Sequence, residues 1–269
     1  GSTVKFSSWS VKKIQLNGYW RNNGLDDWTD LSPYGNDGDA QNAVAADVIQ
    51  LQEVPYFKKD TFGLPMNKVR ERALNLDGDS YVEIADDNSL DFGAANGSGG
   101  AFSIDGWARF TGSTSRGMIF ASGGNPIGAE SGSFAIFTKI DAGNRRLEFI
   151  VNGEAIDANI NSKVADGDWF HFAATRDTSG GLELYVDSES FGNLSATSNS
   201  SATVDTGSVR YIGRDSGTDR YYKNLIDGIR LYNRELLAAE VAKNFKATKS
   251  KHKNNIVSNW SDDFSSSFI

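Results

Sequence analysis

Four stretches in the second half of the chain decide its fold. They read, in order, DWFHFAATRD (168–177), LELYVDSES (182–190), VRYIGRD (209–215) and NLIDGIRLYNREL (224–236). Each is a short run of aromatic and branched residues bounded by Asp, Asn, Ser or Gly, as strands joined by turns require. The order predicts an all-β sandwich of antiparallel sheets, followed by one short helix.

Length and composition favour a single large domain. The chain has 269 residues with 28 glycines and 4 prolines, and 12% of the residues are aromatic. Sandwiches of this size commonly form one domain. Further upstream, the alternation in AFSIDGWARF (101–110) is typical of a half-buried strand. It predicts that Phe102, Ile104, Ala108 and Phe110 share the face that lies in the core.

A helix is predicted directly after the last strand. Asn233 can cap it, and four apolar residues follow at helical spacing, namely Leu236, Leu237, Val241 and Phe245. This helix should be short and should pack on the edge of the sandwich.

The charge balance and the missing cysteines exclude several classes of protein. A net charge of −8 argues against nucleic acid as a partner, because phosphate binding needs a dense basic surface. With no cysteine, disulfide-stapled modules and cysteine-based metal sites are excluded. The sequence has no long apolar run, and we expect neither a signal peptide nor a membrane segment in it.

The composition changes at both ends of the chain. We expect an N-terminal extension over 1–13, one folded β-sandwich domain over 14–248 and a polar tail over 249–269. Both ends carry serine-aromatic stretches, FSSWS (6–10) and SNWSDDFSSSFI (258–269). These ends are candidates for pairing with each other or with a neighbouring chain in a homo-oligomer.

Five stretches, taken in order, resemble a known family. They are GYW with TDLSPYGNDG (18–38), LNLDGDSYVEI (74–84), AFSIDGWARF (101–110), DWFHFAATRD with LELYVD (168–187), and IGRD through NLIDGIRLYNRELLAAEV (212–241). The chain is similar to the laminin-G-like, concanavalin A-like lectin/glucanase domains of bacteria and phages. This resemblance implies a jelly-roll sandwich of two antiparallel sheets, used mostly for binding glycans or proteins, often with one structural calcium ion.

The sequence departs from the family pattern at two turns. Asp-Gly stands at 227–228 where the family commonly has Asp-Glu, which removes a possible carboxylate ligand. Asp-Ser at 187–188 replaces the Asp-Gly of a hairpin. The stretch NFKATKS (244–250) also looks like the ends of such domains in the structural genes of marine tailed bacteriophages. It predicts a virion or extracellular location and a glycan or a virion protein as partner.

An acidic loop is the candidate calcium site. Ca²⁺ takes about six to eight oxygen ligands, and Asp30, Asn36 and Asp37 supply oxygens within one turn-rich loop. The resemblance implies that Asp227, on a late strand, meets this loop. The alternative is that turns favour Asp and Asn for reasons of backbone geometry.

The loop over 214–224 is the candidate ligand site. Sugar binding in water relies on an aromatic ring against a pyranose face and on a few fixed polar groups. The loop offers such side chains in Arg214, Asp215, Asp219, Arg220, Tyr221 and Tyr222. The alternative is an ordinary connection whose tyrosines cover the edge of the sandwich.

Glucan hydrolysis is the sharper alternative to binding. Glucanases of this broad fold use two carboxylates on one strand face, and Glu183 and Asp187 share a face by alternation. Their spacing does not match the Glu-x-Asp-x-x-Glu or Glu-x-Asp-x-Glu pattern of the enzymes, and Asp187 falls at a hairpin turn. His171 has no Ser or Asp partner at motif spacing, so it is interpreted as structural.

The sequence therefore predicts a non-catalytic, lectin-like module that binds glycan. A virion structural protein that uses the sandwich and the tails for subunit contacts is the alternative, and a β-glucan hydrolase is the second alternative.

Overall fold

The computed structural model describes residues 16–22, 27–42, 48–50, 72–93, 100–110, 112, 116–123, 125–128, 131–204, 207, 209–216 and 220–253. The strands in these ranges are β1 Leu16–Asn22, β2 Asp27–Asp30, β3 Gly38–Gln41, β4 Val48–Gln50, β5 Arg72–Asn75, β6 Tyr81–Ile84, β7 Phe102–Arg109, β8 Gly117–Ser122, β9 Phe134–Asp141, β10 Asn144–Val151, β11 Glu154–Asn159, β12 Trp169–Arg176, β13 Leu182–Val186, β14 Glu189–Leu194, β15 Arg210–Ile212 and β16 Leu225–Tyr232. Two short 3₁₀ turns, η2 Asn88–Leu90 and η3 Pro126–Gly128, and one helix, α1 Ala238–Lys253, complete the described elements.

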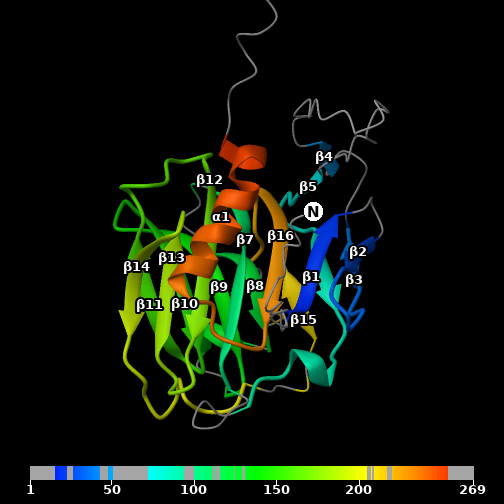
Figure 1. The fold of residues 1–269 in the computed structure, drawn as a ribbon. Helices are drawn as coiled ribbons and strands as arrows, with labels where there is room; N and C mark the ends of the chain where they lie inside the picture. The colour runs from blue at the N-terminus through cyan, green and yellow to red at the C-terminus, as the bar shows by residue number, and fades with distance from the viewer. Residues whose placement is uncertain are drawn as a thin grey trace, which may run out of the picture.

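The strands follow one antiparallel path that folds into two layers. Its order is β11-β10-β9-β8-β15-β6-β3-β2-β1-β16-β7-β12-β13-β14. The strands β2 and β1 connect the layers on one side, and β11 contacts β13 and β14 on the other. The chain therefore forms a sandwich that is nearly closed into a barrel, as the sequence predicts, with α1 lying across the layer that contains β7, β12 and β16 (Figure 1).

Aromatic rings between the two layers form the core. Phe102, Ile104, Ala108 and Phe110 are all fully buried, which confirms the predicted face of β7. The ring of Phe102 lies 4.7 Å from Phe92 and 4.8 Å from Phe134, measured between centroids. Rings at these separations add packing energy beyond the area that they bury.

The helix differs from the prediction at both ends. It begins at Ala238 and not directly after Asn233, because the Glu240 carboxylate accepts the backbone N–H of Leu237 (3.1 Å) and caps the first turn. Leu236 is buried ahead of the helix, whereas Leu237 is 57% exposed.

The helix also continues to Lys253, into the stretch predicted to be a tail. The ring of His252 stacks on Trp107 at 4.2 Å, and its Nε2 lies 3.0 Å from Asp227. The tail boundary at 249 was therefore wrong, because a histidine and not an apolar residue anchors the last turn. The serine-aromatic ends lie outside the described residues, so their predicted pairing stays a prediction.

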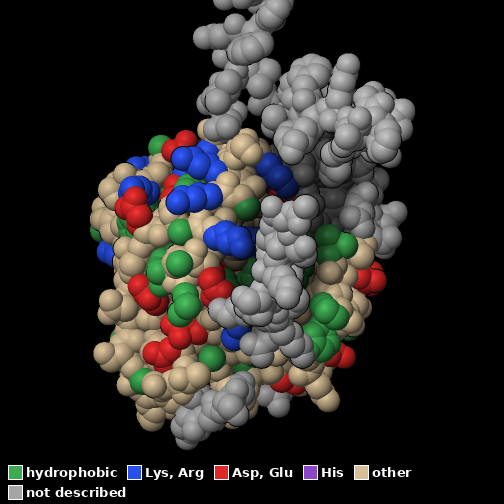
Figure 2. Space-filling view, viewed as in Figure 1, with side chains coloured by type: hydrophobic (Ala, Val, Ile, Leu, Met, Phe, Trp, Pro, Cys, Tyr) green, Lys and Arg blue, Asp and Glu red, His purple; other side chains and the backbone are tan. Residues whose placement is uncertain are grey.

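The surface of the helix is basic. Lys243, Lys246 and Lys249 are exposed along it, and Figure 2 shows Lys and Arg gathered along α1 with Asp and Glu below it on the same face. No helix among the described residues is long and apolar enough to cross a membrane.

Candidate functional site

Three tyrosines and one arginine meet on the outer surface of β6 and β15, and we call them the tyrosine patch: Tyr81, Tyr211, Tyr221 and Arg214. The guanidinium carbon of Arg214 lies 4.5 Å from the ring centroid of Tyr81, 5.2 Å from that of Tyr211 and 5.3 Å from that of Tyr221. The Tyr81 ring lies 5.9 Å from Tyr211 and 6.2 Å from Tyr221. One cation is therefore surrounded by three aromatic rings, each within the range of a cation–π interaction.

Strand alternation and one glycine build the patch. On paired strands β6 and β15, Val82 and Ile212 point into the core, so Tyr81 and Tyr211 point outward. Gly213 follows with φ +94°, a left-handed conformation that favours glycine, and the chain turns there. This turn directs Arg214 over the tyrosines.

Two charged side chains near the patch, Glu83 and Arg214, affect the pKa of Tyr211. Burial raises the pKa of Tyr211, and the Glu83 carboxylate acts in the same direction, whereas the Arg214 charge acts to lower it. The phenol is therefore uncharged at neutral pH, and Tyr211 is 8% exposed at the base of the patch.

The predicted loop residues divide between the patch and its support. Arg214 and Tyr221 belong to the patch. Asp215 is fully buried and pairs with Arg220 at 2.7 Å, so these two charges hold the loop. Tyr222 is also fully buried, and its hydroxyl donates to the backbone carbonyl of Arg109 (2.6 Å).

Burial raises the pKa of Tyr222, and its side chain is inaccessible to a ligand. Its prediction as a ligand-binding residue is therefore corrected, whereas Asp219 lies outside the described residues. Sequence reasoning missed Tyr81 and Tyr211, for which the outward positions of two alternating strands were the available signal.

The candidate calcium loop is held by its own hydrogen bonds. Asp30 is 6% exposed, and its Oδ1 accepts the N–H groups of Tyr19 (2.7 Å) and Ser32 (2.8 Å). Its Oδ2 accepts the Ser32 hydroxyl (2.6 Å) and the Asn36 N–H (3.0 Å). Asp37 in turn accepts the N–H of Asp30 (2.8 Å). A cation at Asp30 would face the hydrogens of these donors, so the loop does not fit Ca²⁺.

Asp227 lies elsewhere, beneath the last turn of α1. Its Oδ2 contacts His252 Nε2 (3.0 Å), and its Oδ1 is buried with no hydrogen-bond partner among the described residues. The next residue, Gly228, has φ +62° at an irregularity in the pairing of β16 with β7. This left-handed conformation favours glycine, the residue found at this position. The structure brings Asp30, Asn36 and Asp37 together but not Asp227.

Structural calcium stays a prediction from the family resemblance. The described residues contain no group of three or more His, Asp or Glu arranged to hold a metal ion. If a native site exists, the melting temperature should be higher in millimolar Ca²⁺ than in chelator, because a ligand bound only by the folded state stabilises it. Equal melting temperatures would show that the folded protein has no calcium site that stabilises it.

A group of buried titratable side chains lies between β7, β12, β16 and α1. Asp105 is fully buried and receives two hydrogen bonds from Arg230 (2.7 and 2.8 Å) and one from Asn244 (2.8 Å). Nε2 of the fully buried His171 lies 3.7 Å from Asp105 Oδ2, within ion-pairing reach and beyond a direct hydrogen bond. Burial acts to raise the pKa of Asp105, but the Arg230 charge and His171 hold it below its ordinary value.

The two carboxylates considered for the glucanase alternative are engaged in structural contacts. Glu183 accepts the hydroxyls of Tyr185 (2.6 Å) and Ser190 (2.7 Å). Asp187 accepts the backbone N–H of His171 (3.0 Å) and forms an ion pair with Lys253. Asp187 and Ser188 have φ +50° and +71°, which confirms the predicted hairpin turn between β13 and β14.

Two antiparallel layers, nearly closed on each other and carrying a partly exposed aromatic patch, define a lectin-like jelly-roll domain. A sequence profile described as the concanavalin A-like lectin/glucanases superfamily matches residues 76–242, and the chain belongs to this family. The predicted resemblance and fold class are thereby confirmed. The family description names both lectins and glucanases, so membership does not decide between binding and hydrolysis.

Three solved structures illustrate the similarity of the fold. Domain 4 of AbnA, a GH43 extracellular arabinanase of Geobacillus stearothermophilus solved in complex with arabinotriose, is similar with a TM-score of 0.55 and 18% identity, over 86% of this chain and 98% of that one. The binding domain of Paraclostridial Mosquitocidal Protein 1 has a TM-score of 0.59 and 17% identity, over 87% and 52%. That of botulinum neurotoxin serotype D has a TM-score of 0.59 and 14% identity, over 87% and 51%.

These similarities show the fold alone, because the identities are low. The match extends over about half the length of the toxin binding domains. No curated protein sequence matches the chain.

Proposed function

We propose that this protein is a non-catalytic carbohydrate-recognition module and that the tyrosine patch is its ligand site. The observation that carries the proposal is the group of three tyrosine rings around Arg214 on the surface of the sandwich. A tyrosine ring can stack on the apolar face of a sugar, while the phenols and the guanidinium donate hydrogen bonds to its oxygens. Aromatic rings with a few fixed polar groups are the usual composition of such sites.

The comparisons support this proposal by analogy. The arabinanase domain covered almost completely by this chain was solved with a bound arabino-oligosaccharide, and the two toxin domains are named as binding domains. One fold hosts many functions, so the residues of the patch, and not the fold, indicate binding.

Alanine at Tyr81 or Tyr221 tests the site. Each substitution removes one ring from the patch, and we expect the dissociation constant for a glycan identified on an array to rise about tenfold, since an aromatic stacking contact is worth about 1 kcal/mol or more. Titration calorimetry at constant salt gives the measurement.

Tyr34 provides the matched control for these substitutions. It is a 49% exposed tyrosine on the Asp30 loop, outside the patch, so Tyr34→Ala should bind as the unmodified protein does. An array without any bound glycan would count against the proposed function, and a loss confined to Tyr34→Ala would move the site to that loop.

The proposal excludes glucan hydrolysis, and the engaged carboxylates support that exclusion. Glu183 and Asp187 each hold two structural contacts and do not form an isolated catalytic pair. We expect no release of reducing sugar from β-glucans. Release that disappears in Glu183→Gln would contradict the proposal and favour the glucanase alternative.

We also propose a virion or extracellular location, supported by the sequence of residues 244–250 alone. Assembly through the ends has no support in the described residues, so truncation after Lys253 provides its test. If the domain is a monomer, light scattering should give the molar mass of a single chain both with and without residues 254–269. An oligomer that is lost on truncation would favour the virion structural protein.

A further inference from the structure

Arg214 is partly buried, is surrounded by the three tyrosine rings of the patch and has no carboxylate partner among the described residues. Its Nε donates to the backbone carbonyl of Asp215 (2.7 Å), and its Nη1 lies 3.4 Å from the hydroxyl of Tyr221. No Asp or Glu among the described residues lies within ion-pairing distance of it. Its remaining N–H groups are not used by these contacts, since the guanidinium has five donors.

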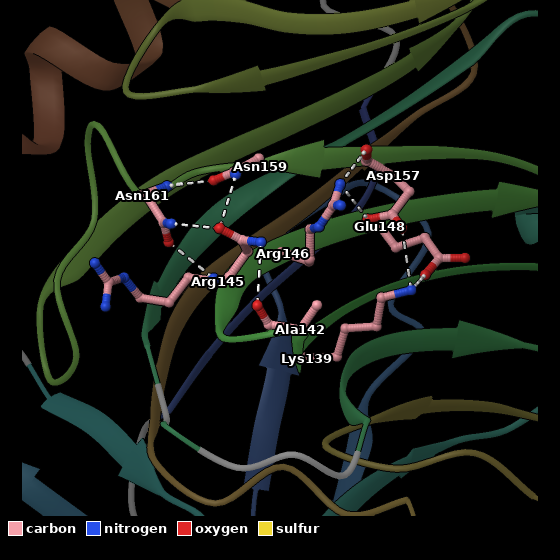
Figure 3. A network of polar contacts seen from close by, with 9 residues as sticks. Lys139, Ala142, Arg145, Arg146, Glu148, Asp157, Asn159 and Asn161 are labelled. Atoms are coloured by element: carbon pink, nitrogen blue, oxygen red, sulfur yellow. Dashed lines mark hydrogen bonds and ion pairs between the residues drawn. The ribbon is translucent and has the colours of Figure 1, made fainter.

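Other arginines are paired with acidic side chains. Arg146 lies 3.5 Å from Asp157, and Figure 3 shows this pair near Asn159 and Asn161. The further pairs are Arg210 with Asp86 and Asp91, Arg220 with Asp215, Arg230 with Asp105 and Arg234 with Glu240. Arg176 also lacks a carboxylate, but it donates to four backbone carbonyls. Arg214 differs from it in retaining N–H groups that its own contacts do not use, and an acidic ligand can accept hydrogen bonds from them.

The tyrosine patch also restricts which acidic ligands can bind to Arg214. Three rings pack around the guanidinium, and its unused N–H groups can match the two oxygens of a carboxylate along the edge of the planar fork. The same rings flank the approach and can stack on the ring that bears the carboxylate. The overall negative charge disfavours non-specific binding of polyanions, so an anion that binds here must be held by local contacts.

We propose that the tyrosine patch recognises a carboxylate-bearing sugar, a uronic acid residue in a polysaccharide, through Arg214. This inference rests on the proposed function and names its ligand class. The edge of Arg214 donates two hydrogen bonds to the sugar carboxylate, and the tyrosines contact the pyranose ring. The bond to the Asp215 carbonyl holds the guanidinium in place.

Matched acidic and uncharged polysaccharides test the ligand class. The probes are oligomers of polygalacturonate, alginate and hyaluronate, each beside its methyl-esterified form, which keeps the sugar ring and removes the charge. Calorimetry on the full chain at about 0.15 M salt limits long-range attraction. We expect at least one acidic probe to bind about tenfold or more tightly than its ester, as a charge-assisted hydrogen-bond pair would produce.

Two arginine variants locate the preference. Arg214→Gln should remove the difference between acid and ester, whereas Arg146→Gln, which removes the same charge from a paired arginine, should retain it. Arg214→Lys keeps the charge without the planar fork and should retain only part of the preference. Unchanged melting temperatures show that the variants are folded.

The outcomes separate this inference from the proposed function. If acid and ester bind equally, or if only neutral glycans bind, the inference is overturned and the patch remains a glycan site. Preference that survives Arg214→Gln in a folded variant also overturns it. If no glycan binds at all, the proposed function itself is lost.

Discussion

Replacement of Arg176 by methionine is expected to lower the free energy of unfolding by about 3–5 kcal/mol. Arg176 lies on β12 with no exposed surface, and its guanidinium lies 4.9 Å from the ring centroid of Phe102. It donates to four backbone carbonyls, those of Gly93 (2.7 Å), Gly100 (2.6 Å), Ser200 (3.2 Å) and Ala202 (2.8 Å). One side chain therefore joins three segments that are distant in the sequence.

The expected cost comes from the carbonyl groups that lose their donor. Methionine is shorter and apolar, so the variant fills the part of the space taken by the aliphatic stem and leaves the buried acceptors unpaired. Each such acceptor costs about 1–3 kcal/mol, and partial access of water to the loops reduces the sum. Burial lowers the pKa of Arg176 to about 10, so the guanidinium is still charged at neutral pH and its hydrogen bonds are charge-assisted.

Denaturant unfolding followed by circular dichroism measures this effect. Arg146→Met is the matched control, because its ion pair with Asp157 lies at the surface and should be worth about 0–1 kcal/mol. Arg176→Lys keeps the charge but cannot reach all four carbonyls, so its loss should lie between the other two. A stability of Arg176→Met within the range of the control would refute the role assigned to this residue.

The sequence predicts features that depend on local periodicity. Strand alternation predicts that Phe102 and Ile104 lie on the core face, and both residues are buried there. The hairpin at Asp187 is predicted by the turn-forming residues Asp and Ser. The end of the helix was missed for a physical reason. His252 is anchored by Trp107 and Asp227, and apolar periodicity carries no signal for a stacked histidine whose partners lie on other elements.

The candidate site was half predictable for the same reason. Arg214 and Tyr221 are neighbours in one loop, so composition alone indicates them. Tyr81 and Tyr211 reach the patch through the pairing of β6 with β15, which a single sequence does not specify. The opposite error occurred at the acidic loop, where Asp30 looks like a metal ligand and instead accepts hydrogen bonds from its own loop and from β1.

Acidification from pH 7 to pH 5 is expected to destabilise the fold through His171. Burial lowers the pKa of His171 below its ordinary value of 6.5, and the nearby Asp105 only partly opposes this effect. Below that pH the unfolded chain takes up a proton that the folded chain resists. The contribution of His171 is therefore present above about pH 6.5 and decreases by about 1.4 kcal/mol per pH unit as the pH falls toward the folded-state pKa.

Groups around His171 determine how clearly this effect appears. Asp105 on β7, Asp187 at the hairpin and Arg230 on β16 face it, and the rings of Trp107 and Phe245 enclose it. Because the pKa of Asp105 is lowered, the stability that it contributes is lost only below its ordinary value of 3.8, outside the interval. Burial raises the pKa of Glu235, which acts with the opposite sign and stabilises the fold slightly as the pH falls.

Unfolding free energies of His171→Phe at pH 7 and pH 5 isolate the contribution. Phenylalanine keeps an aromatic ring in the enclosure and cannot be protonated, so the difference between the two pH values should shrink even if the variant is less stable at both. His252 is the only other histidine of the chain. It lies at the end of α1, where its ring nitrogens contact the Thr248 carbonyl and Asp227, so His252→Gln is the matched control and should leave the acid-induced loss in place. If instead His252→Gln removes the loss and His171→Phe keeps it, the acid sensitivity belongs to the end of α1 and not to the buried strand pair.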